Sequence, residues 1–340
     1  MNRSAVPPPV TQVMEAAESW LPRRMAQVES RLADVVTAGG ERLGPDASAT
    51  LEAGGKRLRP MLVLLCAGPE AGPGATRAAA AVELVHMATL VHDDVLDAAP
   101  LRRGRPTVFS ESGRERATAV GDLLLSRAFA ELAVGPPDPG EDAAAAGAER
   151  AASERQVAIL ADASVALALG ELAQRRDAFD VGMDAERYLD RCLLKTARLF
   201  ECACVIGRDE DATQEALAGF GTEIGLAFQM LDDVLDVSGP PERTGKARGT
   251  DLLDGTVTLP FIWAREEDPS LSEADLHELD AEGAEELCER IAATGALERV
   301  CAEARGRVQR AKDLVVSAPL DAGRRELLAM VADGVVERYS

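Results

Sequence analysis

The sequence predicts an all-α protein of a single domain, and three observations lead to that prediction. Hydrophobic residues make up 46% of the 340 residues, but aromatic residues make up only 3%. Ala and Leu favour helices, whereas the β-branched and aromatic residues typical of strands are thinly spread. Apolar residues recur at helical spacing over most of the chain, and no stretch shows the sustained alternation of a half-buried strand.

The expected elements follow one another along the chain with Gly and Pro clusters between them. The proline-rich start predicts a disordered tail over residues 1–11, followed by one domain over residues 12–340. Residues 134–147, VGPPDPGEDAAAAG, predict a flexible loop between helices. Helices are expected at residues 12–37, 60–67, 74–98, 116–133, 144–174, 184–207, 210–238 and 257–266, with three or four more between 272 and 338.

Charge, hydropathy and cysteine usage narrow the possible functions. The net charge of −21 argues against a nucleic-acid partner, which would need a basic surface. The longest apolar runs, such as PMLVLLCAG, fall short of the roughly 18 residues that a transmembrane segment needs. The six cysteines show no zinc-ligand spacing, and no signal peptide is recognised at the start. We therefore expect reduced thiols in a cytoplasmic protein without a transmembrane segment.

The pentad DDVLD occurs twice, at residues 93–97 and 232–236, each time at the end of an apolar helical run. Aspartates four residues apart share one face of a helix, where like charges repel unless a cation lies between them. A ligand set of carboxylate oxygens without a His or Cys cluster favours Mg²⁺ over zinc. A solvated acidic surface is the alternative for one such motif, but two copies favour metal binding.

Basic segments accompany the acidic motifs. GGKRLRP lies at residues 54–60 and PLRRGRPT at 100–107, directly after the first pentad. Lys195–Thr196 and TGKARGTD, at residues 244–251, hold two more of the four lysines in the chain. Arg forks and Lys ammonium groups are the usual protein ligands of phosphates. Each segment alone is a weak signal, but together with paired metal motifs they predict an enzyme that acts on a diphosphate.

At this point a family resemblance is clear. From about residue 54 to residue 260 the sequence resembles the trans (E-type) isoprenyl diphosphate synthases of the polyprenyl synthetase family. The matching motifs, in order, are GGKRLRP, ELVHMATLVHDDVLD, LRRGRPT, VGDLLLSRAF, GELAQ, LLKTARLF, FQMLDDVLD and GTDLLDGTVTLP. The resemblance implies a bundle of mostly antiparallel helices around a central cavity (isoprenoid synthase type I fold), a homodimer, and bound Mg²⁺, with three ions when substrate is present.

The resemblance also implies roles for individual residues. Isopentenyl diphosphate would be held by Lys56, Arg57, Arg59, His86 and Arg103. The metal ligands would be Asp93, Asp97, Asp232 and Asp236, with Asp94 and Asp233 in support. The allylic diphosphate (dimethylallyl, geranyl or farnesyl) would contact Arg102, Lys195 and Lys246, while Thr196 and Gln229 line the site of the developing positive charge. The reaction implied is ionisation of the allylic substrate, condensation and proton loss, with the 239–256 loop as a lid.

The residues before the first pentad bear on product length, and Thr256 departs from the family pattern. Val85, Ala88 and Thr89 lie one and two turns before Asp93, and their small size predicts an open tunnel and a product of geranylgeranyl length or longer. A floor set deeper, by Leu123, Leu124 or Phe129, would give a farnesyl or geranyl product instead. Thr256 stands where the family usually has Lys, which removes one basic contact.

Three other functions are less well supported by the motifs. A class I terpene cyclase would not need GGKRLRP and His86, which imply a second diphosphate. A non-catalytic subunit of a heteromeric synthase would be expected to lack an Asp motif, and this chain has both. A purely structural acidic helical protein would not need the ordered basic segments.

Overall fold

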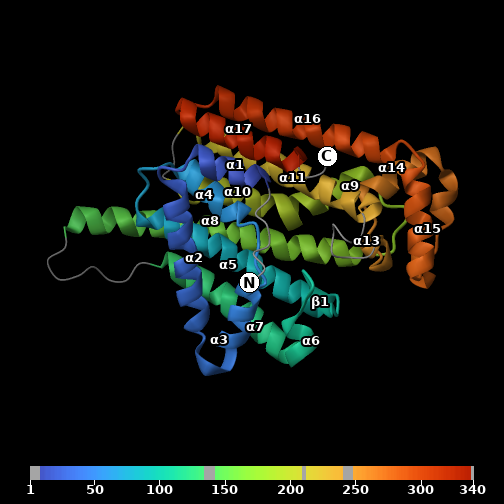
Figure 1. The fold of residues 1–340 in the computed structure, drawn as a ribbon, viewed down its shortest axis with the longest axis horizontal. Helices are drawn as coiled ribbons and strands as arrows, with labels where there is room; N and C mark the ends of the chain where they lie inside the picture. The colour runs from blue at the N-terminus through green and yellow to red at the C-terminus, as the bar shows by residue number, and fades with distance from the viewer. Residues whose placement is uncertain (1–7, 134–141, 209–211, 240–247, 338–340) are drawn as a thin grey trace.

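The computed structural model describes residues 8–133, 142–208, 212–239 and 248–337. Helices dominate these residues, as predicted (Figure 1). The α-helices are α1 Pro8–Ala16, α2 Leu21–Thr37, α3 Gly40–Glu52, α4 Leu58–Ala67, α5 Pro73–Leu96, α6 Val108–Ser112, α7 Arg114–Leu132, α8 Ala143–Arg176, α9 Ala185–Cys192, α10 Arg198–Val205, α11 Gln214–Ser238, α13 Thr250–Leu253, α14 Leu259–Glu267, α15 Ala281–Ala292, α16 Ala296–Ser317 and α17 Ala322–Glu337.

Shorter elements join these helices. A π-helical turn, η1 Leu193–Ala197, connects α9 to α10, and two 3₁₀ turns, η2 Pro269–Glu273 and η3 Leu276–Glu278, precede α15. Two strands, β1 Leu101–Arg102 and β2 Arg105–Pro106, form a small antiparallel hairpin. Its turn uses two left-handed residues, Arg103 with φ 53° and Gly104 with φ 73°, as a two-residue hairpin turn requires.

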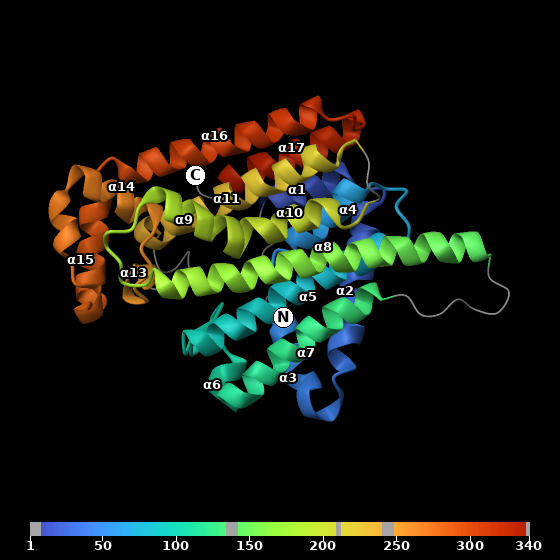
Figure 2. The ribbon, with the colours of Figure 1, turned by 180° about the vertical axis from the view of Figure 1, so that it is seen from behind.

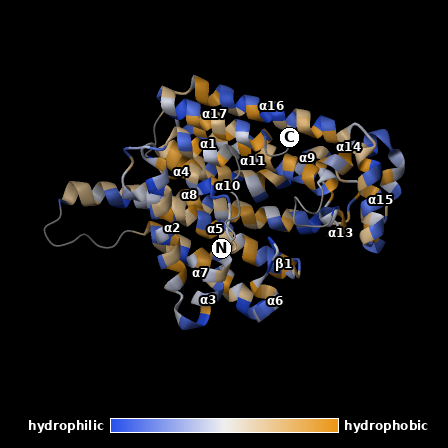
Figure 3. Ribbon diagram, viewed as in Figure 1, coloured by the Kyte–Doolittle hydropathy of each residue, from blue (hydrophilic) through white to orange (hydrophobic). Residues whose placement is uncertain are grey.

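The long helices α5, α8 and α11 run through the body of the molecule. Helix α5 packs against α4 and α7, and helix α11 packs against α10 and α16. Both views place α16 and α17 along one side and α3, α6 and α7 on the opposite side (Figures 1 and 2). The buried core is rich in Ala, Val and Leu, and hydrophobic and hydrophilic residues alternate along the outer helix α16 (Figure 3).

The start of the chain differs from the sequence prediction. Helix α1 begins at Pro8, so residues 8–11, predicted as part of a disordered tail, are helical, and residues 1–7 lie outside the described part. The single helix predicted over residues 12–37 is divided into α1 and α2. Helix α3 was not predicted, because Gly39, Gly40, Gly44 and Pro45 looked like loop punctuation. Most of the predicted loop at 134–147 also lies outside the described residues, and α8 begins at Ala143.

Helix α8 is longer and more apolar than the short apolar runs noted in the sequence. Among the described residues, this one helix passes a test of length and composition for a membrane span, with a mean hydropathy of 1.5 over its most apolar window. A third of that window is buried inside the protein, and the helix packs against α10 and η1. Long core helices of water-soluble proteins pass the same test, so the finding is weak evidence for a membrane span.

Candidate active site

The first acidic motif ends helix α5. Asp94 is 5% exposed and accepts a hydrogen bond from Arg102 Nε at 2.7 Å, whereas Asp93 is half-buried and Asp97 exposed. Burial raises the pKa of Asp93 to about 6, helped by Glu171 and opposed by Lys195 and Arg102. Carboxylates at a helix C-terminus also meet the negative end of the helix dipole. The motif therefore requires cations close to Asp93 and Asp97.

The second acidic motif lies in the last two turns of helix α11. Asp233 is 2% exposed and accepts hydrogen bonds from Tyr188 Oη at 2.6 Å and Gln229 Nε2 at 2.8 Å. Burial, together with the nearby Asp251, raises the pKa of Asp233 to about 8. Asp232 is exposed, and Asp236 accepts the backbone N–H of Asp251 at 3.1 Å. Asp233 thus points into the protein, which leaves Asp232 and Asp236 as the outward pair of this motif.

The π-helical turn η1 connects the surroundings of the two motifs. Lys195 Nζ donates to Glu171 Oε2 at 2.6 Å and acts electrostatically on Asp93. The next residue, Thr196, donates its hydroxyl to Gln229 Oε1 at 2.8 Å, and the same amide donates to Asp233. One turn therefore presents a cation towards the first motif and a hydroxyl towards the second. Such π-helical turns within longer helices are frequent at functional sites.

Two glycines allow neighbouring helices to approach this turn closely. A Cβ added at Gly170 in α8 would lie 2.5 Å from the backbone nitrogen of Lys195. A Cβ added at Gly225 in α11 would lie 2.6 Å from Cα of Ala197. Both distances are far below a van der Waals contact, and the opposing atoms are backbone. The turn that carries Lys195 and Thr196 is thus held between α8 and α11 at glycine contacts on both sides.

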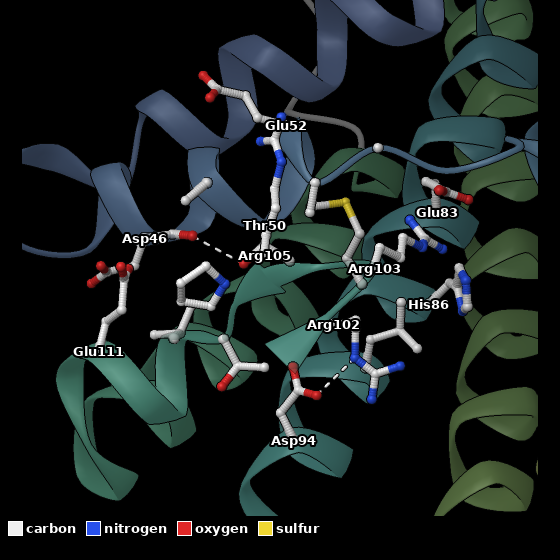
Figure 4. Close-up of a pocket in the computed structure, with 18 of the residues that line it drawn as sticks. Asp46, Thr50, Glu52, Glu83, His86, Asp94, Arg102, Arg103, Arg105 and Glu111 are labelled. Atoms are coloured by element: carbon white, nitrogen blue, oxygen red, sulfur yellow. Dashed lines mark hydrogen bonds and ion pairs between the residues drawn. The ribbon is translucent and has the colours of Figure 1, made fainter. Parts of the chain in front are cut away.

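A cavity of about 220 Å³ opens beside the first motif, bounded by α3, α5, the hairpin and α6. Arg102, Arg103 and His86 point into it, and Asp94 is joined to Arg102 at its edge (Figure 4). Burial lowers the pKa of His86 well below its usual value, and the neighbouring arginines, Arg59 and Arg103 foremost, lower it further. His86 is therefore neutral at pH 7. The lining holds both charges: the hairpin side carries Arg102, Arg103 and Arg105, which suit an anionic ligand, and the rest of the wall includes the carboxylates of Asp46, Glu52, Glu83, Asp94 and Glu111.

The segment GGKRLRP passes along this cavity. Arg59 Nε is buried without a hydrogen-bond partner in the described part of the chain, and the guanidinium lies 4.4 Å from the centre of the Phe200 ring. Burial lowers the pKa of Arg59 to about 10. Arg57 is engaged with protein groups: its nitrogens donate to Glu29 and Glu83 carboxylates at 2.7 and 2.8 Å and to a backbone carbonyl. Arg57 thus differs from Arg59, whose Nε retains unused hydrogen-bonding capacity.

The remaining predicted residues fall into three groups. Lys56 is exposed on the loop before α4. Lys246 lies outside the described residues, together with the rest of residues 240–247 of the proposed lid. Val85 and Ala88 are buried in the core at 1% and 2% exposure, and Thr89 is half-buried with its hydroxyl bound to the carbonyl of His86. None of these three lines the cavity beside the first motif, and their role in product length stays a prediction.

Sequence reasoning missed several residues around the acidic motifs. Asp251 and Tyr188 contact the second motif, and Glu171 and Arg175 contact Lys195 and Asp97 near the first. Asp251 lies within TGKARGTD and Glu171 within GELAQ, so their motifs were noted but these carboxylates were not assigned. Tyr188 and Arg175 gave no such signal, because only the packing of α8 and α9 brings them to the site.

The carboxylates fit Mg²⁺ by their donor chemistry. Within the described ranges, no group of three or more His, Cys, Asp and Glu side chains is arranged as a ready-made metal site. Mg²⁺ does not require one, because it typically takes one or two carboxylates and completes its shell with water and phosphate oxygens. The paired aspartates and the neighbouring arginines of the hairpin, which could hold the phosphates, match that pattern.

One-turn aspartate pairs on two helices, beside an arginine-bearing cavity in a mostly helical fold, are the features of an enzyme that uses a divalent metal to act on a diphosphate. The model of the polyprenyl synthetase family matches residues 42–292. The chain therefore belongs to the polyprenyl synthetase family, and it is an enzyme that transfers prenyl groups and uses isoprenyl diphosphate substrates.

Similar proteins agree with this assignment. The chain is 37% identical over 258 residues to component 2 of heptaprenyl diphosphate synthase from Geobacillus stearothermophilus, covering 74% of this chain and 75% of that protein. It is 32% identical to geranylfarnesyl diphosphate synthase from Aeropyrum pernix, covering 92% and 99%. The structure of polyprenyl synthase from Caulobacter crescentus, complexed with calcium and isoprenyl diphosphate, superposes with a TM-score of 0.84 at 31% identity, covering 99% and 100% of the two chains.

The charge environment of His86 leads to a prediction about acid stability. Because the pKa of His86 is lower in the folded than in the unfolded protein, the unfolded state binds more protons below pH 6.5, and folding stability falls as the pH drops. We expect the wild type to lose about 1–2 kcal/mol more unfolding free energy than His86→Gln between pH 7.5 and pH 5. Urea unfolding at both pH values measures this difference.

Replacement of an exposed histidine, His277→Gln, controls for the loss of a histidine as such. Equal pH dependence of the wild type and His86→Gln would contradict the prediction.

Proposed function

We propose that the protein catalyses the Mg²⁺-dependent, head-to-tail condensation of isopentenyl diphosphate with an allylic diphosphate, giving an all-trans product of geranylgeranyl length or longer. The observation that supports this best is η1, where Lys195 is directed towards the first acidic motif and Thr196 is joined through Gln229 to the second. This arrangement allows both motifs to act on one diphosphate.

The allylic diphosphate would lie between the motifs. Asp93, Asp97, Asp232 and Asp236 would hold Mg²⁺, three ions in all when substrate is bound. When bound, Mg²⁺ neutralises charge on the departing diphosphate and so favours cleavage of the allylic carbon–oxygen bond. Arg102 and Lys195 would add fixed positive charge to the same diphosphate, together with Lys246, which lies outside the described residues.

The arginine-lined side of the cavity would bind isopentenyl diphosphate. Arg103 supplies a cation there, and neutral His86 can donate one hydrogen bond without adding charge. Arg59 and Lys56 lie outside the cavity lining and would add positive charge from the adjoining GGKRLRP segment. Arg57 already pairs with Glu83, which is 3% exposed, so we assign it the role of holding the GGKRLRP loop in place. The two diphosphates would therefore be neutralised by different residues. Arg102, Lys195 and Lys246 would act on the allylic diphosphate, and Arg103, Arg59 and Lys56 on isopentenyl diphosphate.

The hydroxyl of Thr196 and the amide of Gln229 would line the site of the allylic cation. Their mutual hydrogen bond fixes the amide orientation, so that its oxygen faces Thr196 and its nitrogen donates to Asp233. The double bond of isopentenyl diphosphate attacks the cation, and the released diphosphate accepts the proton. Exclusion of water protects the cation during this step.

A product assay tests the proposal. Purified protein is incubated with Mg²⁺, isopentenyl diphosphate and, in separate reactions, dimethylallyl, geranyl or farnesyl diphosphate. A product of geranylgeranyl length or longer is expected after removal of phosphate. A product that stops at farnesyl would contradict the role given to Val85, Ala88 and Thr89. Cyclised products without elongation would favour a terpene cyclase.

A second candidate function is that of the catalytic subunit of a two-component synthase. The relative from Geobacillus stearothermophilus and one from Bacillus subtilis are both named component 2 of heptaprenyl diphosphate synthase. An inactive purified chain that keeps both acidic motifs would favour this function, and activity of the chain alone would exclude it.

We propose that the enzyme is a homodimer that pairs through helix α8. Val165, Leu169 and Leu172 are 60%, 51% and 66% exposed, and their spacing places them on one face of the helix. The N-terminal part of α8 also extends past the neighbouring helices in both views (Figures 1 and 2). Contiguous exposed apolar residues are typical of protein–protein interfaces.

All six cysteines are free thiols, consistent with the cytoplasmic location we propose.

We expect Leu169→Glu to convert the dimer into a monomer, because it places a charge in the middle of the apolar stripe. Multi-angle light scattering during size-exclusion chromatography measures the mass. Val316→Glu is the matched control, since Val316 is 64% exposed on α16, away from α8. A Leu169→Glu protein that remains dimeric would place the interface elsewhere.

A further inference from the structure

The first acidic motif has an internal cation that the reaction outlined above does not use. Arg175 Nη2 in α8 donates to Asp97 Oδ1 at 2.5 Å. Its Nε donates to Glu171 Oε1 at 2.8 Å, one helical turn back on the same helix. The guanidinium thus bridges helix α8 to the last residue of the DDVLD pentad on α5.

Glu171 organises two cations at once. Its Oε1 accepts from Arg175 and its Oε2 accepts from Lys195 at 2.6 Å. The Glu171 side chain is 18% exposed, whereas those of Arg175 and Asp97 are 42% and 30% exposed. Arg175 is therefore anchored on its own helix, and the contact with Asp97 is the more accessible of its two ion pairs.

The contact with Asp97 conflicts with metal binding at the same carboxylate. A Mg²⁺ ligand oxygen lies about 2.0–2.1 Å from the ion, so a guanidinium on that oxygen and the ion would be two positive charges within a few ångströms. Because the hydrogen bond from its Nε to Glu171 can remain, the Arg175 guanidinium can move away from Asp97 and still lie close to the first motif.

We infer that Arg175 occupies Asp97 in the metal-free enzyme and competes with the metal for it, so that free metal binds weakly and enters together with a diphosphate. This inference rests on the proposed function, in which Asp97 is a metal ligand. The diphosphate brings the negative charge that a displaced Arg175 can face. Arg175 is accordingly a positioning residue that sets the order in which metal and diphosphate bind.

The affinity of the free metal tests the inference. Titration with Mn²⁺ alone, followed by electron paramagnetic resonance, gives its dissociation constant without any turnover. We expect Arg175→Gln to lower that constant about three- to tenfold, since it removes one exposed ion pair and one positive charge close to the metal. With inorganic diphosphate present, we expect the wild type and the variant to bind Mn²⁺ within about twofold of each other.

Arg176→Gln is a matched control. Arg176 is the next residue on α8, pairs with Asp177 at 2.9 Å and is 69% exposed, so its replacement removes the same charge without touching Asp97. Equal tightening by both variants would overturn the inference in favour of a net-charge effect, and no tightening by Arg175→Gln would overturn it outright. If Arg175→Gln fails to fold, Arg175→Lys keeps the charge but lacks the fork that spans both carboxylates, and it should bind Mn²⁺ more tightly than the wild type.

Prenyl transfer by the wild type, assayed in parallel, separates the two proposals. An active wild type without the expected change in Arg175→Gln would disprove the role of Arg175 alone. An inactive wild type in which Arg175→Gln still tightens Mn²⁺ binding would leave the competition at Asp97 established and overturn the proposal that this chain catalyses the reaction alone.

Discussion

Asp93→Asn is expected to lower kcat/KM by roughly two to three orders of magnitude, the range found when one element of transition-state charge stabilisation is removed. The amide keeps the shape of the side chain but cannot supply the charge that holds a divalent cation. Steady-state kinetics at saturating Mg²⁺ with an allylic diphosphate and isopentenyl diphosphate measure the effect.

The control substitution is Asp190→Asn, which makes the same chemical change at an exposed position on α9. Asp190→Asn should leave kcat/KM within about twofold of the wild type. If Asp93→Asn has an equally small effect, Asp93 is not a metal ligand.

Asp93→Asn should also stabilise the metal-free protein against unfolding. The pKa of Asp93 is raised from 3.8 to about 6, which means that its charged form is less favourable in the folded than in the unfolded state. At pH 7 the free energy of unfolding should therefore rise by about 1–3 kcal/mol in Asp93→Asn, and this gain should disappear below about pH 4. A variant that is more stable but inactive would exclude misfolding as the cause of lost activity.

Gly170→Ala is expected to have a large effect on both stability and activity. The new Cβ would meet the backbone of Lys195 at 2.5 Å, so α8 or η1 must move. Overpacking of this kind costs about 1–3 kcal/mol, and a shift of Lys195 would also weaken contact with the allylic diphosphate. Thermal unfolding and the KM for the allylic substrate are the two measurements.

Gly147→Ala on the same helix should act in the opposite direction. No atom lies within 4 Å of a Cβ added at Gly147, and alanine is the better helix former by about 0.5–1 kcal/mol. Stabilisation by Gly147→Ala with destabilisation by Gly170→Ala would show that the contact with η1 matters and the change of residue type does not. Unchanged thermal stability and KM in Gly170→Ala would mean that α8 and η1 can move apart at little energetic cost.

Much of the fold could be predicted because its long helices carry a regular apolar pattern. The predicted ranges of α5, α7 and α11 agree with the structure within a few residues at most of their ends, since Gly and Pro lie just outside these apolar segments. Helix α3 could not be predicted, because three glycines and Pro45 precede or interrupt it and are typical of a loop. The hairpin was missed because each strand has only two residues.

The candidate site, likewise, could be predicted from the sequence only in part. The aspartate pairs could be predicted from their spacing, because i and i+4 share a helix face in any α-helix. Tyr188 and Arg175 could not, because neither lies in a recognisable motif and each reaches its aspartate only through the packing of α8 and α9. Arg57 carries the same signal as Arg59 in sequence, but the buried carboxylate of Glu83 and the partly exposed carboxylate of Glu29, on other helices, engage it.

The π-helical turn also limits how the chain can change in length. The backbone N–H of Arg198 bonds to the carbonyl of Leu193, five residues earlier, so the turn holds one residue more than an α-helix would. Deleting one residue there would restore an ordinary α-helix. It would also rotate the residues after the deletion by about 100° about the helix axis relative to the residues before it. Lys195 and Thr196 could then no longer reach Glu171 and Gln229 together. Insertions and deletions in this enzyme are therefore compatible with its loops but not with residues 193–197.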